Sequence, residues 1–194
     1  MRLTLGKMSW GVIGKLFLIS PLFASTSKEA AAIANAPVYN WAYAEEASGL
    51  LEQIRSLSTQ AAEKTHFLKF ASQRNDLHWE SHALGLHQVS QHINAMGEKL
   101  DRLQEIHSLI APWQQKAVER VMPNAVALAV HTEEAVAYVN EHQGRLWVPS
   151  YTYRVSAMSK HAEEIGMSVG SFLDYAKTSD RLKGLERQIE WSET

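Results

Sequence analysis

The sequence predicts an all-α fold, namely an up-down-up-down antiparallel four-helix bundle that follows an N-terminal signal peptide. Apolar residues recur at steps of three and four in four long segments, which is the pattern of helices with one buried face. Short polar or proline-containing stretches separate these segments, and strand-like alternation and internal repeats are absent from the sequence. Four such helices joined by short connections bury their apolar stripes most simply in a bundle.

Composition limits the function classes that fit the chain. The 194 residues are 45% hydrophobic, which suits one domain folded around a core. Cysteine is absent, and this excludes disulfides, thiolate metal ligands, iron–sulfur clusters, covalent c-type haem and a cysteine nucleophile. The net charge of −2 becomes −5 when residues 1–36 are removed, because that segment holds four basic residues and one acidic residue. A mildly acidic body does not fit nucleic acid, whose phosphates require a basic face.

The N-terminal segment has the order of a secretory signal peptide. Residues 1–15 carry three basic side chains, residues 16–24 form the apolar run LFLISPLFA, and Ala32-Ile33-Ala34 fits the small-residue cleavage pattern. We therefore expect a signal peptide and flexible leader at 1–36, a single domain at 37–194, and export to the periplasm or the extracellular space. An uncleaved anchor and a buried amphipathic helix are the alternatives. Lys15 leaves the apolar run too short to span a bilayer, so no stable transmembrane span is expected in the mature chain.

The first two helices are predicted at about 42–73 and 77–110, with the polar break Arg74-Asn75-Asp76 between them. Without that break they would merge into one long rod. The second segment holds five of the nine histidines. The predicted stripe of the first helix is Ala47, Leu50, Ile54, Leu57, Ala61, Thr65 and Leu68, and that of the second is Leu86, Val89, Ile93, Met96, Leu100 and Leu103.

The last two helices are predicted at about 112–142 and 151–191. Pro112 suits the first turn of the third helix, Pro123 is expected to kink it, and Gly144 is a plausible stop. Beyond Ser179 the stripe of the fourth helix drifts, and Gly184 among charged residues predicts a frayed or bent end. The third stripe is Val118, Val121, Met122, Ala125, Leu128, Ala129, Thr132, Val136 and Val139, and the fourth is Val155, Met158, Ala162, Ile165, Val169, Phe172 and Ala176.

A metal site is predicted at one end of the bundle as an alternative to a purely structural role. His78 and His82 are four residues apart, so their rings can converge on one ion from a single helix face. An antiparallel arrangement brings the connections around Asn75 and Trp147 to the same end, which adds His142 as a third ligand for zinc or another divalent transition metal. The competing interpretation is a bundle end closed by aromatic side chains whose polar atoms reach water. These aromatic residues are Trp79, Trp147, Tyr151 and Tyr153.

Two cofactor sites typical of helical bundles fit the sequence poorly. A di-iron site needs inward carboxylates and Glu-x-x-His pairs, but Glu63 and His66 lie far from the stripe of their helix, as do Glu134 and Glu164 from theirs. A haem held by histidine or methionine is chemically conceivable without cysteine, although methionine at helical spacing is more often core filler. The candidate haem ligands are His82, Met96, Met122, Met158 and His161.

The functional prediction is an exported, non-enzymatic helical bundle of the cell envelope that acts as an interaction or structural module, with no catalytic residue and no cofactor assigned. Neither a G-x-S-x-G nucleophile elbow nor a phosphate-binding glycine loop occurs in the sequence. The expected partner is another protein or a second copy in a homo-oligomer. The alternatives are a small periplasmic metal-binding protein that uses the helix-end histidines, and an enzyme whose site forms between helices. Apolar residues off the stripes that could form a second contact surface are Phe67, Phe70, Val126, Val130 and Tyr138.

Overall fold

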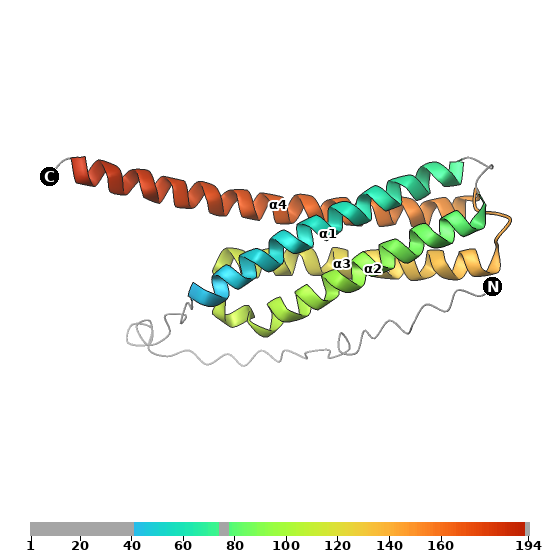
Figure 1. Ribbon diagram of the computed structural model, residues 1–194, viewed down its shortest axis with the longest axis horizontal. Coiled ribbons are helices and arrows are strands. Elements are labelled where there is room, and N and C mark those ends of the chain that lie inside the picture. The colour runs from blue at the N-terminus through green and yellow to red at the C-terminus, as the bar shows by residue number, and fades with distance from the viewer. Residues whose placement is uncertain (1–40, 74–77, 193–194) are drawn as a thin grey trace, which may run out of the picture.

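The computed structural model describes residues 41–73 and 78–192, and all regular structure in these two ranges is helical. The all-α prediction with four main helices is therefore confirmed for the described chain. The predicted signal peptide and leader at 1–36 lie outside the described residues. The helices are α1 (Trp41–Gln73), α2 (Trp79–Glu105), the short 3-10 helix η1 (His107–Leu109), α3 (Pro112–Glu141) and α4 (Pro149–Ser192), as Figure 1 shows.

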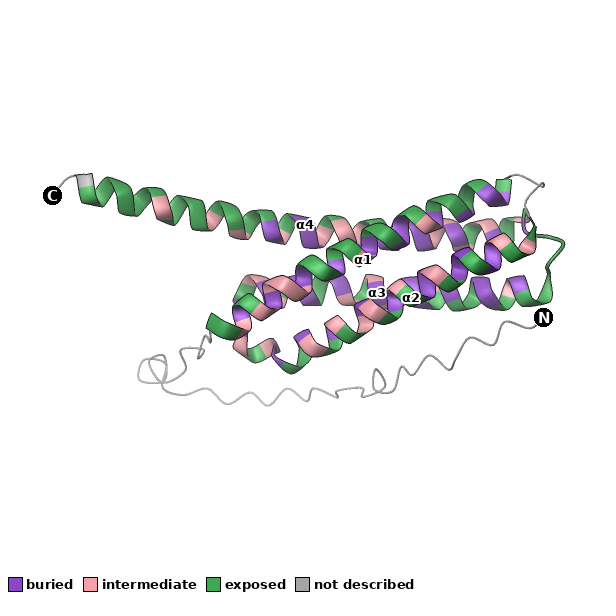
Figure 2. Cartoon of the chain, in the orientation of Figure 1, coloured by how far each residue is buried: buried purple, intermediate pink, exposed green. Residues whose placement is uncertain are grey.

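The four long helices pack side by side around one apolar core. Each helix contacts the next one along the chain, and α4 also packs along α1, so the four helices close a ring of contacts. Figure 2 shows the buried residues as stripes on the faces that the helices turn toward one another. Among the described helices, none has an apolar stretch long enough to cross a membrane.

The predicted stripes of α2 and α3 match the core closely. All six residues predicted for α2 are buried, and of the nine predicted for α3 only Met122 is merely half-buried. These helices each bury one contiguous face, so the 3.6-residue period identifies it directly.

The predicted stripe of α1 needs correction at two positions. Leu51 and Ser58 are fully buried, whereas the predicted Leu50 and Leu57 are half-buried. The reason is that α1 packs against both α2 and α4 and buries a wider face than a single stripe. A buried serine also gives no hydrophobic signal, although the Ser58 hydroxyl is satisfied by donating to the Arg55 carbonyl at 2.8 Å.

The helix boundaries follow the predicted breaks with one difference. Helix α1 ends at Gln73 and α2 begins at Trp79, so the two segments are separate helices, although the predicted caps Asn75 and Asp76 lie outside the described residues. Helix α2 ends at Glu105 rather than near residue 110, and η1 follows it. The tighter turns there allow Ile106 and Ile110 to enter the core before Pro112 starts α3.

A close approach between α1 and α2 depends on a glycine. A Cβ atom at Gly85 would lie 2.8 Å from Cδ2 of Leu68, whose side chain is fully buried. Such a contact is shorter than packed carbon atoms tolerate, so the absent side chain of Gly85 lets the two helices pack at this point.

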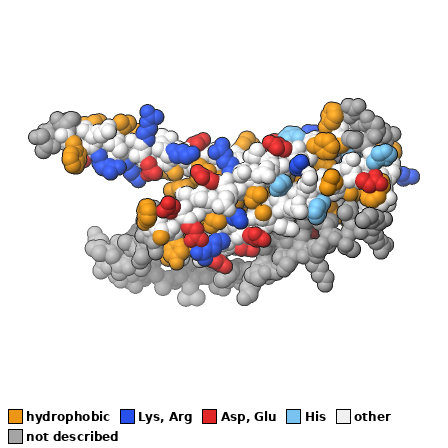
Figure 3. Space-filling view, viewed as in Figure 1, with side chains coloured by type: hydrophobic (Ala, Val, Ile, Leu, Met, Phe, Trp, Pro, Cys, Tyr) orange, Lys and Arg blue, Asp and Glu red, His pale blue; other side chains and the backbone are white. Residues whose placement is uncertain are grey.

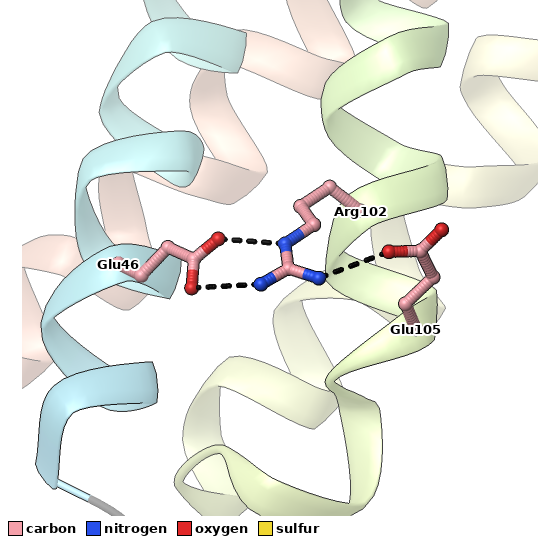
Figure 4. Close-up of polar contacts among 3 residues, drawn as sticks. All are labelled: Glu46, Arg102 and Glu105. Carbon is pink, nitrogen blue, oxygen red and sulfur yellow. Dashed lines mark hydrogen bonds and ion pairs between the residues drawn. The ribbon is translucent and has the colours of Figure 1, made fainter.

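A charged cluster at the other end of α1 and α2 links the same two helices (Figure 4). Arg102 on α2 donates from Nε and Nη2 to the two carboxylate oxygens of Glu46 on α1, at 2.7 and 3.2 Å. Its Nη1 donates to Glu105 at 3.0 Å. The hydrogen bond from Arg102 and its charge lower the pKa of Glu46. The bidentate geometry aligns α1 with α2, while the partial exposure of both groups limits its contribution to stability.

The C-terminal part of α4 continues as a helix through Gly184 to Ser192, whereas the sequence predicted a frayed or bent end after Ser179. At 44 residues α4 is longer than α1, with 33, and it extends beyond the other helices in Figure 1. Leu173 is its last buried residue, and Figure 2 shows mainly exposed positions after it. We call residues 174–192 the α4 arm. Its charged side chains are spaced along a helical sequence that contains no proline and a single glycine, Gly184, which a helix tolerates.

Candidate functional site

One buried polar contact joins the starts of α2 and α4. The Nδ1 atom of His82 lies 3.0 Å from the hydroxyl of Tyr151, and the two rings meet edge to face with centroids 5.5 Å apart. His82 is 2% exposed and Tyr151 is fully buried. Burial lowers the pKa of His82 and raises that of Tyr151, so both groups are neutral near pH 7. The Nδ1 atom of a neutral imidazole can accept a hydrogen bond from the Tyr151 hydroxyl, which gives both side chains a polar partner inside the core.

Two further rings extend this contact toward the surface. Tyr138 on α3 stacks on Tyr151 at 5.7 Å and on His142 at 4.4 Å between centroids. The four rings of His82, Tyr151, Tyr138 and His142 form what we call the end stack. It runs from the buried His82 to the exposed His142. Its rings come from α2, from α3 and the residue that follows it, and from α4.

The structure brings the three predicted metal ligands to one end of the bundle without gathering them around one point. His82 is engaged with Tyr151, His142 stacks on Tyr138, and His78 is exposed before the first turn of α2. Within residues 41–73 and 78–192, no three histidine or acidic side chains are grouped so that they could hold a metal ion. The metal site therefore stays a prediction.

The aromatic residues named for this end separate into buried and exposed groups. Tyr151 is fully buried and its hydroxyl is bonded within the protein, rather than reaching water as the aromatic-plug interpretation expected. Trp79 packs partly buried against the core. Trp147 and Tyr153 are 51% and 67% exposed. Of these four aromatic residues, Tyr151 is the one that is fully buried in the core.

A second histidine pair lies between α3 and α4. His131 and His161 stack with centroids 5.8 Å apart, and His161 donates from Nδ1 to the Oδ1 of Asn124 at 2.9 Å. Burial is the main cause of the lowered pKa of His161, and the neighbouring His131 acts in the same direction. Glu134 and Glu164, which approach these rings at 3.5 and 3.8 Å, are partly exposed surface carboxylates. The pair therefore resembles a packed interhelical contact more than a cofactor-binding pocket.

The residues predicted from sequence to form a second contact surface differ in their exposure. Phe67 and Phe70 on α1 are 48% and 55% exposed, and Val130 on α3 is 47% exposed. Val126 is half-buried and Tyr138 belongs to the end stack. The exposed members lie on α1 and α3, two helices that make little contact with each other.

The α4 arm carries a series of exposed apolar side chains. Five large apolar side chains along it are between 48% and 84% exposed. Sequence reasoning missed this surface, although the spacing of three and four between Leu182, Leu185 and Ile189 is a visible signal. The exposed residues are Tyr175, Leu182, Leu185, Ile189 and Trp191.

The fold and these surfaces define the protein as an all-helical bundle with a projecting helix. Comparison with known proteins found no matching family model, no matching curated protein and no matching solved structure.

Protonation of His82 is expected to make the protein less stable in mild acid. Because burial lowers the pKa of His82 below its ordinary value of 6.5, the unfolded chain binds a proton more readily than the folded chain. The contribution of neutral His82 to the free energy of unfolding is therefore fully present above pH 6.5. This contribution declines as the pH falls below 6.5. Urea unfolding at pH 7.5 and 5.5 measures the loss, with a limiting slope of about 1.4 kcal/mol per pH unit.

The variant His82→Gln is expected to reduce this pH dependence, because glutamine keeps a polar partner for Tyr151 but does not titrate. His87→Gln, on the exposed side of the same helix, is the matched control and should leave the slope unchanged. His92 and His161, whose pKa values burial also lowers, will preserve part of the slope. Equal slopes in His82→Gln and the wild type would contradict the assignment to His82.

Proposed function

We propose that the protein is an exported, non-enzymatic interaction module of the cell envelope, in which an up-down-up-down bundle holds the α4 arm for binding to another protein surface. The observation that carries this proposal is the exposed apolar surface of the arm. An extended apolar surface presented by a soluble fold typically marks an interaction site. Short connections between α2, α3 and α4 support the antiparallel path of the chain.

The arm is continuous with a well-anchored segment. The first 25 residues of α4 pack along α1 and α3 and bury side chains at regular helical spacing from Tyr151 to Leu173. A helix that is fixed over this length carries its extension in a defined direction, which lowers the entropic cost of binding compared with a loose tail. The bundle therefore serves as a rigid base for the arm.

Mixed charge on the arm favours a protein partner over nucleic acid. Between residues 174 and 192 the arm has four basic and four acidic side chains, and Figure 3 shows both signs along it. A phosphate backbone would select a basic face, whereas alternating charges suit the rim of an interface between proteins. Export rests on the signal-like order of residues 1–36 in the sequence.

Site-specific photocrosslinking in the cells that make the protein tests this function. Benzoylphenylalanine replaces Leu185 on the apolar side of the arm in one variant and Asp180, another exposed arm residue, in the control. We expect defined protein adducts from position 185 and at most weak ones from position 180. We also expect the chain to be recovered outside the cytoplasm, with a mass that corresponds to cleavage after Ala34.

The outcomes separate the two parts of the proposal. Absence of adducts from position 185, or the same adducts from both positions, would show that the apolar side of the arm is not a binding surface. A full-length chain that remains in the cytoplasm would instead contradict export.

A further inference from the structure

Four of the five large exposed apolar residues of the α4 arm follow a heptad repeat, and Trp191 lies outside it. Tyr175, Leu182 and Ile189 are seven residues apart, and Thr178 and Leu185 occupy the intermediate positions three residues after the first two. With the first set at a and the second at d, the arm has the alternating steps of three and four that define a coiled-coil seam. We call these five residues the arm stripe. Leu185 at d and Ile189 at a match the combination that favours two-stranded coils, whereas Tyr175 and Leu182 occupy the other a positions.

The arm stripe faces away from the bundle. At about 100° per residue, its apolar members centre about 160° from the α4 residues that face the core. The core-facing residues run from Tyr151 and Val155 to Leu173 and are buried, whereas Leu182 and Ile189 are 56% and 60% exposed. The stripe is consequently not a continuation of the core that the remaining helices could cover. A second helix can approach it without meeting the bundle of the same chain.

Charges beside the stripe are complementary to a second copy in one orientation. Arg181 occupies position g and Glu186 occupies position e. In a parallel, in-register pair, a residue at g lies beside the e residue five positions later on the other helix. Arg181 of each chain then meets Glu186 of the other, and the two-fold symmetry forms this pair twice.

The antiparallel alternatives lack this complementarity. In an antiparallel pair, e residues face e residues and g residues face g residues. The register that layers Leu182 on Leu185 places Arg181 beside Gln188 and Glu186 beside Ser179, so no opposite charges meet. Shifting one helix of the antiparallel pair by a heptad in one direction places Arg181 opposite Arg181 of the other copy. Shifting it in the other direction places Glu186 opposite Glu186, and both arrangements are repulsive.

We propose that two copies of this chain associate through their α4 arms as a parallel, in-register, two-stranded coiled coil. The inference rests on the proposed function and names the partner as a second copy. The equal numbers of basic and acidic side chains on the arm mean that net charge does not oppose self-association. The two bundles lie on the outer sides of the coil, because each arm stripe points away from its own bundle.

Charge reversal tests the pairing without altering the core. Light scattering of the full chain over roughly 1–100 µM should show a mass that rises from one chain toward two. Arg181→Glu and Glu186→Arg should each shift the midpoint of this rise at least about fivefold to higher concentration, because like charges then meet twice. An equimolar mixture of the two variants should recover association, since only the mixed pair joins opposite charges. Lys183→Glu, at position b and away from the seam, makes the same charge change as Arg181→Glu and should leave the midpoint unaltered.

A cysteine probe tests the orientation, because the native chain contains no cysteine. Thr178→Cys places a thiol at a d position, where a parallel in-register pair brings the two copies together and mild oxidation should give a disulfide-linked dimer. Lys177→Cys, one residue away and off the seam, should crosslink far less. In the leucine-on-leucine antiparallel register, position 178 faces Ile189, and Thr178→Cys would remain uncrosslinked.

Several results would overturn the proposal. A monomer throughout the concentration range, a dimer that is insensitive to both charge reversals, or equal crosslinking at positions 177 and 178 would each do so. Failure of self-association can be distinguished from failure of the proposed function. If Leu185 crosslinks in cells to a different protein while the purified chain stays monomeric, the arm is a binding surface but its partner is not a second copy.

Discussion

Tyr151→Ala is expected to lower the free energy of unfolding by about 3–5 kcal/mol. The ring is fully buried at the start of α4, so its removal leaves a cavity among the end-stack residues. It also leaves the buried His82 without the hydroxyl that lies 3.0 Å from its Nδ1 atom. Chemical denaturation monitored by circular dichroism measures the change. At about 2–4 °C per kcal/mol for a chain of this size, the midpoint of thermal unfolding should fall by roughly 6–20 °C.

Two comparisons separate the cavity from the hydrogen bond. Tyr151→Phe keeps the ring and removes only the hydroxyl, so its cost should be about 1–2 kcal/mol. Tyr153→Ala removes the same side chain from a position two residues later that is 67% exposed, and should cost less than about 1 kcal/mol. A loss in Tyr153→Ala as large as that in Tyr151→Ala would show that the end stack does not close the core.

Gln114→Ala is expected to destabilise the protein by about 2–4 kcal/mol. Gln114 is 1% exposed, and its Oε1 accepts a hydrogen bond from the Ala111 backbone amide at 2.9 Å. Its Nε2 donates to the Ala44 carbonyl at 2.7 Å and to the Ser48 hydroxyl at 3.0 Å, which ties the first turn of α3 to α1. Truncation leaves the amide of Ala111 buried without this acceptor and opens a cavity beside it. Urea unfolding curves measure the loss.

Two substitutions show which part of the Gln114 side chain matters. Gln114→Met fills a similar volume without hydrogen bonds, so the cost that remains, about 1–3 kcal/mol, reports the unsatisfied polar groups. Gln115→Ala is the matched control, because Gln115 is only half-buried and bonds to carbonyls in the preceding turn rather than to another helix. If Gln115→Ala proved as costly as Gln114→Ala, the interhelical bonds of Gln114 would not be the source of its effect.

Hydrophobic periodicity predicted the parts of the fold in which each helix buries one apolar face. The α2 stripe from Leu86 to Leu103 is an example, because every member lies at a 3.6-residue spacing and enters the core. Pro112 likewise marked the start of α3, since its fixed backbone geometry suits the first turn of a helix. These features are local consequences of the sequence.

Polar residues inside the core could not be predicted in the same way. Gln114 and Ser58 follow the helical spacing of their apolar neighbours but carry no hydrophobic signal. The side-chain amide of Gln114 is hydrogen-bonded to residues about seventy positions earlier in the chain, which local spacing does not reveal. The contact between His82 and Tyr151 also joins residues far apart in sequence. The sequence placed both near one end of the bundle, but the pairing of their atoms depends on how α2 and α4 pack.

The α4 arm was misjudged because its apolar side changes face. Up to Leu173 the stripe of α4 points into the bundle, and beyond it Leu182, Leu185 and Ile189 lie on nearly the opposite side of the helix. A helical wheel drawn for the whole of α4 therefore shows an apolar stripe that weakens toward the C-terminus, and such weakening predicts fraying. Two shorter windows show two stripes, each with its own direction.

The length of α4 also divides the stability of the protein into two levels. In the bundled part of α4, residues 149–173, a backbone amide exchanges its hydrogen for deuterium only when the bundle opens. An amide in the arm of a single chain needs only local unwinding of the helix. A helical segment of this size held by its own backbone bonds is marginally stable in water. One unfolding temperature therefore describes the bundle alone, and a partner that covers the arm would raise the protection of the arm amides while leaving that temperature nearly unchanged.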